Sequence, residues 1–149
     1  MLLAAAAALQ VAAAPSAGPT VWQPHEVTLT ADSIYPQPAV WLSLQLNATL
    51  THSASGLALE APGFWDGGKT WKLRFAAPVA GEWRWRTSCS EAGDTGLHGA
   101  AGSFSVAPYT GSNALYRHGI LRPHKSGRFL EHADGVPFYW LGDTHCERC

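Results

Sequence analysis

Hydrophobic and polar residues alternate along much of the chain. From Val40 to Leu50 the even positions are apolar, and from Ser43 onward the odd positions are polar. A period of two residues places one face of a β-strand against a core and the other face in water. The same pattern recurs in shorter segments, at positions 27–29, 57–59, 71–75, 83–86 and 104–106. The alternation therefore predicts six or more short strands.

Glycine-rich spacers separate the predicted strands. They are Ser55-Gly56, Asp66-Gly67-Gly68, 78–81 and 99–102. Asp-Gly and Gly-Gly pairs supply the positive φ angles that tight hairpins require. No segment shows the 3.6-residue periodicity of an amphipathic helix. The sequence thus predicts an all-β fold, an immunoglobulin-like antiparallel β-sandwich over residues 21–108.

The pattern changes after residue 108. Residues 109–127 are irregular, which predicts a linker, and a short strand with an Asp134-Gly135 hairpin turn follows. The run Phe138–Leu141 is then apolar at every position, which is typical of a strand buried on both faces in a parallel sheet. Residues 128–149 are therefore predicted to be the truncated start of a second domain.

The amino terminus differs from the rest of the chain. Residues 2–14 are apolar except for Gln10, as in the hydrophobic region of a secretion signal, although Lys and Arg are absent before them. We expect residues 1–17 to be a signal peptide and the protein to be secreted. The alternative is an alanine-rich disordered tail.

Composition and charge exclude several classes of protein. With 46% hydrophobic and 14% charged residues, the chain has too much core material to be disordered. The net charge of −1 argues against nucleic acid or anionic lipid as a partner. No apolar run reaches the roughly 18 residues that a membrane span needs.

Several short motifs carry a family resemblance. The segments are 62–67 (PGFWDG), 71–75 (WKLRF), 81–83 (GEW), 102–104 (GSF) and 133–138 (ADGVPF). They resemble the sandwich domain of unknown function, family 5060, found at the amino terminus of secreted glycoside-hydrolase-like proteins. Leu141-Gly142-Asp143-Thr144 resembles the first strand of the apiosidase-like (β/α)-barrel that commonly follows. The chain departs from the family at Cys146, where an aromatic residue is usual.

The resemblance implies an accessory role. A complete (β/α)₈ barrel needs about 250 residues, and the family's catalytic carboxylates lie on later barrel strands. We therefore expect no catalytic residue and no cofactor in this chain. We expect its partner to be the protein's own barrel domain, which this sequence lacks. The resemblance also implies that Asp143 and His145 line the mouth of the parent enzyme's substrate site. Alternatively, Asp143 caps the next backbone turn.

Two further positions are candidate sites. Trp65 is predicted near a hairpin tip, where it docks on the missing barrel, stacks on a sugar ring or packs into the core. Asn47 begins the sequon Asn-Ala-Thr on the wet face of its strand, so it is a candidate glycosylation site.

Half of the basic residues cluster in two strands: Lys69, Lys72, Arg74, Arg84 and Arg86. If those strands are neighbours, the side chains form one basic stripe that attracts acidic polysaccharide. The alternative, which we favour, is a solvated face with charges that protect a sheet edge.

The cysteines do not predict a metal site. Cys146 and Cys149 form a CxxC pair, but zinc sites of this type need a second ligand pair and redox motifs need a βαβ context. Cys89 is the remaining candidate for a disulfide partner.

Two functions follow from these observations. The first is a non-catalytic accessory domain of a secreted carbohydrate-active protein. The alternative is a free-standing extracellular sugar- or protein-binding module, with Trp65 and the basic residues as its contact surface.

Overall fold

The computed structural model of the protein describes residues 18–36 and 43–142. The predicted signal peptide, Asp143, His145 and the CxxC pair lie outside these residues. In chain order the elements are β1 (Pro24–Thr30), β2 (Leu46–His52), β3 (Ala58–Gly67), β4 (Thr70–Ala76), β5 (Gly81–Cys89), β6 (Ala101–Val106), α2 (Ala114–His118), β7 (Leu121–Pro123), β8 (Leu130–His132) and β9 (Pro137–Phe138). The predicted all-β fold is confirmed.

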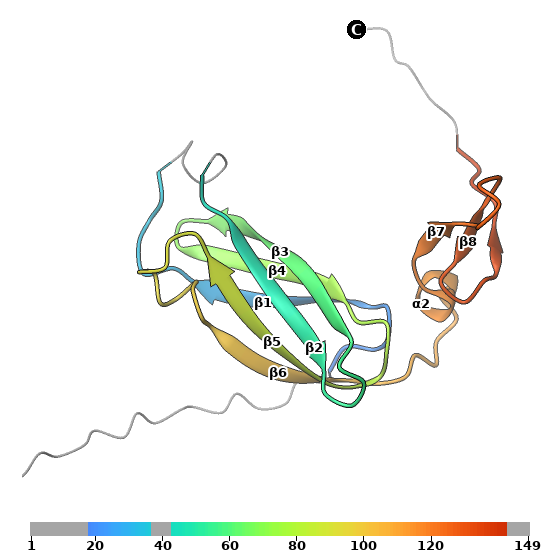
Figure 1. Ribbon diagram of the computed structural model, residues 1–149, viewed down its shortest axis with the longest axis horizontal. Coiled ribbons are helices and arrows are strands. Elements are labelled where there is room, and N and C mark those ends of the chain that lie inside the picture. The colour runs from blue at the N-terminus through green and yellow to red at the C-terminus, as the bar shows by residue number, and fades with distance from the viewer. Residues whose placement is uncertain (1–17, 37–42, 143–149) are drawn as a thin grey trace, which may run out of the picture.

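Six antiparallel strands form a single curled sheet in the order β1-β4-β3-β2-β5-β6 (Figure 1). Strand β3 produces the curl, because residues 58–62 pair with β2 whereas residues 63–67 pair with β4. On the other side, a parallel bridge between Thr20 and Ala107 joins the segment before β1 to the end of β6. The two halves of the sheet enclose one core, which is the predicted sandwich.

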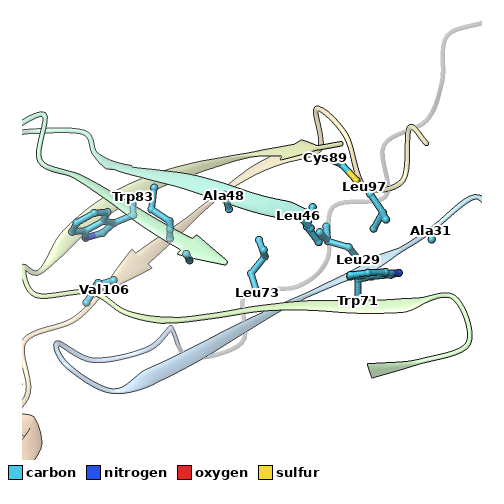
Figure 2. Packing of buried hydrophobic residues seen from close by; sticks show 13 residues of the cluster. Leu29, Ala31, Leu46, Ala48, Trp71, Leu73, Trp83, Cys89, Leu97 and Val106 are labelled. Atoms are coloured by element: carbon cyan, nitrogen blue, oxygen red, sulfur yellow. The ribbon is translucent and has the colours of Figure 1, made fainter. Parts of the chain in front are cut away.

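Alternation along each strand fills that core. Leu46, Ala48 and Leu50 of β2 are buried, and the residues between them are exposed. Figure 2 shows how residues from both halves meet, with Trp71 and Leu73 of β4 across from β2. The buried hydrophobic residues are Leu29, Ala31, Leu46, Ala48, Leu50, Ala61, Trp71, Leu73, Ala77, Trp83, Cys89, Leu97 and Val106. Burial of this apolar surface is the main stabilising contribution to the sandwich.

The glycine-rich spacers serve two different purposes. Gly56, Gly67 and Gly68 have φ angles of 70°, 108° and 54°, and they form the β2–β3 and β3–β4 hairpins as predicted. The spacer at 78–81 instead connects β4 to β5, which are not neighbours in the sheet. It is therefore a crossing between the two halves of the sandwich.

A second, smaller unit follows the sandwich (Figure 1). Strands β7, β8 and β9 form a three-stranded antiparallel sheet, preceded by the five-residue helix α2. Helix α2 and β7 lie within the stretch that the sequence predicted as a linker. The Asp134-Gly135 turn between β8 and β9 is confirmed, with a φ angle of 89° at Gly135. We call residues 112–142 the C-terminal unit.

The end of the C-terminal unit is strongly exposed. Tyr139, Trp140 and Leu141 have exposed fractions of 84%, 70% and 84%. They belong to no strand in the described part of the chain, so the buried parallel strand predicted for Phe138–Leu141 is not seen there. Among the described residues, no helix is both long and apolar enough to cross a membrane.

Candidate functional site

A groove lies on the outer face of β2 and β5. The register pairs Thr49 with Arg86 and Thr51 with Arg84, so hydroxyl and guanidinium groups lie side by side. The groove has a volume of about 500 Å³, and its lining consists of Thr49, Thr51, Arg84, Arg86, Thr87, Ser88, His98 and Gly99. No acidic side chain and no Phe, Tyr or Trp of the described chain is among these residues.

The two arginines of this groove lack counterions. Arg84 and Arg86 are exposed, and neither forms an ion pair or side-chain hydrogen bond with any residue that the structure describes. Strand β5 lies between β2 and β6, so the arginines do not protect a sheet edge. They are charges held on an interior strand.

The single basic stripe, which required the two strands to be neighbours, does not form. Strands β4 and β5 are separated by β3 and β2, so their basic residues do not form one surface. Lys72 on β4 is 2.7 Å from Asp66, and Arg74 on the same strand is 2.6 Å from Glu26. These ion pairs engage the cations of β4, whereas the described chain supplies no ion-pair partner for the two arginines of the groove on β5.

Trp65 lies in β3 beside the β3–β4 hairpin, directly opposite Trp71. It is half-buried and packs against the core, and its indole N–H donates to the carbonyl oxygen of Gly68 at 2.9 Å. The side chain is thus fixed to its own hairpin, with only part of its ring accessible to a sugar or to another domain.

Asn47 is exposed on the outer face of β2, between Pro62 of β3 and Ser88 of β5. Its sequon partner Thr49 is exposed on the same face and also lines the groove. The prediction that Asn47 is accessible to a glycan is therefore compatible with its position. Glycosylation itself stays a prediction.

A buried carboxylate that the sequence analysis missed ties two loops together. Asp94 accepts hydrogen bonds from the Tyr35 hydroxyl at 2.7 Å and from the backbone N–H of Asp32 at 3.0 Å. Asp32 in turn accepts from the Thr95 N–H at 2.7 Å. Burial favours the neutral form of Asp94, but hydrogen bonds from Tyr35 and from backbone amides outweigh it and lower its pKa. Asp32 and Asp94 therefore hold the two loops together, and we call this pair the loop clamp.

Histidines of the C-terminal unit form a second polar cluster. His118 Nδ1 is 2.7 Å from Asp134 Oδ2, and the ring of His132 lies 5.4 Å from that of His118. His132 is buried, with its Nδ1 2.9 Å from the carbonyl oxygen of Gly119. Each ring has a partner within the unit. Within the described residues, no three His, Cys, Asp or Glu side chains form a potential metal site.

Cys89 is a buried thiol at the end of β5, and it forms no disulfide bond within the residues that the structure describes. Burial raises its pKa, which keeps it protonated at neutral pH and lowers its reactivity.

Comparison with known proteins relates part of this chain to a known family. Residues 19–90, which hold β1 to β5, match the family described as a domain of unknown function (DUF5060). The chain carries this domain. A comparison with curated proteins finds no match. The resemblance inferred from motifs such as PGFWDG is therefore confirmed at the level of the DUF5060 domain.

One solved structure is similar to this chain over most of its length. It is described as "a putative glycoside hydrolase" from Bacteroides vulgatus, with 28% sequence identity and a TM-score of 0.61. The likeness covers 80% of this chain but 21% of that protein. Eighty per cent of 149 residues is about 119, more than the sandwich contains, so the likeness extends beyond the DUF5060 domain.

Proposed function

We propose that this chain is the non-catalytic, amino-terminal part of a secreted carbohydrate-active protein. The observation that carries the proposal is the likeness to the Bacteroides vulgatus protein, which includes most of this chain and about a fifth of that one. The DUF5060 sandwich then supplies a rigid body beside a separate catalytic domain.

The carboxylates that the structure describes support a non-catalytic role. Glycosidic cleavage commonly uses two carboxyl groups that flank the bond, one of them a general acid with a raised pKa. The close pair Asp32 and Asp94 is committed to backbone and tyrosine hydrogen bonds, and the pKa of Asp94 is lowered. Glu26 and Asp66 are engaged by Arg74 and Lys72. These groups stabilise the fold.

The exposed apolar end of the C-terminal unit supports the proposal of a neighbouring domain. Leu121, Phe138, Tyr139, Trp140 and Leu141 line an open apolar hollow of about 310 Å³. Contiguous exposed apolar residues of this kind commonly mark contact surfaces. We infer that the catalytic barrel covers this hollow, with Asp143 and His145 beyond it at the substrate cleft. The half-buried Trp65 is a further candidate contact with that barrel.

Secretion and glycosylation belong to the same proposal. The apolar segment within residues 1–17 supplies the export signal, and the exposed Asn47 accepts a glycan where the host modifies secreted proteins.

Expression of the natural reading frame tests the proposal. The chain alone and the product that includes any codons after Cys149 are assayed on a panel of aryl glycosides and polysaccharides. We expect hydrolysis by the longer product and none by the chain alone. Turnover by the chain alone, or a stop codon directly after Cys149, would contradict the proposal.

The second candidate is a free-standing binding module, and the open groove with Arg84 and Arg86 favours it. Under that alternative, the chain alone binds a sugar in a glycan array, Arg84→Gln/Arg86→Gln abolishes this binding, and the longer product hydrolyses no glycan. Under the accessory role, the longer product hydrolyses one.

A further inference from the structure

The groove over β2 and β5, defined above, carries the positive charges of Arg84 and Arg86. No acidic side chain of the described chain forms an ion pair with either of them. Arg84 and Arg86 lie on one strand two residues apart, and their side chains leave the same face of the sheet. Two residues of a strand separate the Cα atoms by about 7 Å. Two guanidinium groups can therefore reach one ligand together.

Several other cations of the described chain already have partners. Lys72 and Arg74 pair with Asp66 and Glu26, and Arg122 pairs with Glu131 at 3.1 Å. Glu82 precedes Arg84 on β5, and Glu60 lies across Thr49 on β3. Neither glutamate lines the groove or forms an ion pair with its arginines in the described part of the chain. The donors of Arg84 and Arg86 are free for a ligand.

The wall of the groove is held in place by the backbone. The amide of Thr87 donates to the carbonyl oxygen of Ala100 at 2.8 Å, and that of Gly99 donates to Thr87 at 3.1 Å. These bonds fix the loop that carries His98 and Gly99 against β5. A preformed wall reduces the conformational entropy that a ligand must overcome on binding.

The chemistry of the lining selects the class of ligand. A guanidinium group donates a planar fork of hydrogen bonds that matches a carboxylate or a sulfate. Thr49, Thr51 and Ser88 add hydroxyl groups that can bond to sugar hydroxyls. The described lining has no Phe, Tyr or Trp ring, so it offers no large aromatic platform on which a neutral sugar stacks.

We propose that the groove over β2 and β5 binds an acidic polysaccharide, with Arg84 and Arg86 holding its carboxylate or sulfate groups. This site goes beyond the accessory role and does not depend on a catalytic domain. It would anchor the protein on an anionic substrate or matrix.

Affinity electrophoresis of the full chain tests the site. Gels contain polygalacturonate, dextran sulfate or unmodified dextran, so the carboxylate and the sulfate are distinguished from each other and from the neutral polymer. We expect retardation by one or both acidic polymers and none by dextran. Retardation by only one of them identifies the anionic group that the groove accepts.

A matched pair of double variants separates the site from overall charge. Arg84→Gln/Arg86→Gln removes two charges from the groove, and Lys125→Gln/Arg128→Gln removes two exposed charges from the C-terminal unit. We expect the groove variant to lose at least tenfold in affinity and the control to stay within twofold of the original chain. Thermal unfolding of each variant checks that the sandwich is intact.

Four results would overturn the proposal. They are an absence of retardation by either acidic polymer, equal retardation by dextran, an equal loss in both double variants, and equally tight binding of oligothymidylate. None of them bears on the accessory role, because that role is tested by hydrolysis with the longer product.

Discussion

The sandwich and the C-terminal unit are stabilised in different ways. All the buried hydrophobic residues of the described chain lie between Leu29 and Val106, within the sandwich. In the C-terminal unit the described buried residues are Gly119 and His132, whereas its large apolar side chains are mostly exposed. These exposed residues are Leu115, Ile120, Phe129, Val136, Tyr139, Trp140 and Leu141. The sandwich therefore contains its own core, and the C-terminal unit does not.

Polar contacts hold the C-terminal unit together. Asn113 caps helix α2 by accepting from the Leu115 N–H at 2.9 Å, and His118 pairs with Asp134. Strands of two or three residues with little burial are marginally stable in water. The sandwich therefore folds by burial of its own core, whereas the described C-terminal unit buries little apolar surface.

The largest expected effect is a cavity in the sandwich. Leu73 is fully buried at the centre of β4, so Leu73→Ala should lower the free energy of unfolding by about 2–5 kcal/mol. Leu115→Ala in the C-terminal unit removes the same side chain from an exposed site and should change it by less than about 0.5 kcal/mol. Urea unfolding followed by tryptophan fluorescence measures both values. Equal losses would refute the contrast between the regions.

A smaller effect is expected at the loop clamp. Asp94→Asn weakens hydrogen bonds to Tyr35 and to the Asp32 amide, and should cost about 1–3 kcal/mol at neutral pH. Because the pKa of Asp94 is lowered in the folded state, its ionised form stabilises the protein above the ordinary carboxyl pKa. That contribution is lost as the pH falls through the folded-state pKa.

The free energy of unfolding is measured for the original chain and for Asp94→Asn from neutral pH down to acidic pH. The original chain should lose stability with acid more steeply than Asp94→Asn. Asp134→Asn is the control from the C-terminal unit, and it should leave the sandwich transition unchanged. Parallel acid profiles for the original chain and Asp94→Asn would show that the clamp carries no ionic stabilisation.

The smallest expected effect on stability comes from removing the C-terminal unit altogether. A chain that ends at Gly111 keeps every buried hydrophobic residue of the described core, so its unfolding free energy should stay within about 0.5 kcal/mol. Its solubility should rise, because exposed residues such as Trp140 and Leu141 are gone. The solubilities of the two chains are compared by the protein concentration at which each begins to scatter light. Lower solubility, or a destabilised sandwich, would contradict the boundary.

Local pattern predicted the strands but not their order. The alternation that places Leu46, Ala48 and Leu50 on one face is a property of one strand, and it is confirmed. The curl at β3 depends on how neighbouring strands pack against each other, since a Cβ added at Gly63 would lie 2.4 Å from Cδ2 of Leu46 on β2. The basic stripe that depended on neighbouring strands does not form for the same reason, because no single strand reveals the order of the strands in the sheet.

The candidate site shows the same limit. The sequence singled out Arg84 and Arg86, but their lack of counterions became visible only with the register of β2 against β5. Asp94 was missed because the residues that donate to it, Asp32 and Tyr35, lie about sixty positions earlier in the chain. A signal was present in the turn-rich segment Glu91–Gly96, where an Asp between glycines often bonds to the backbone.

Amide hydrogen exchange tests most directly the proposal that the sandwich is stable by itself and that a further domain covers the C-terminal unit. Exchange is compared between the chain alone and the product that includes any codons after Cys149. We predict slow exchange for β2 and β5 in both proteins. Residues 114–142 should exchange rapidly in the chain alone and become protected in the longer product. Equal protection of residues 114–142 in the two proteins would contradict the account.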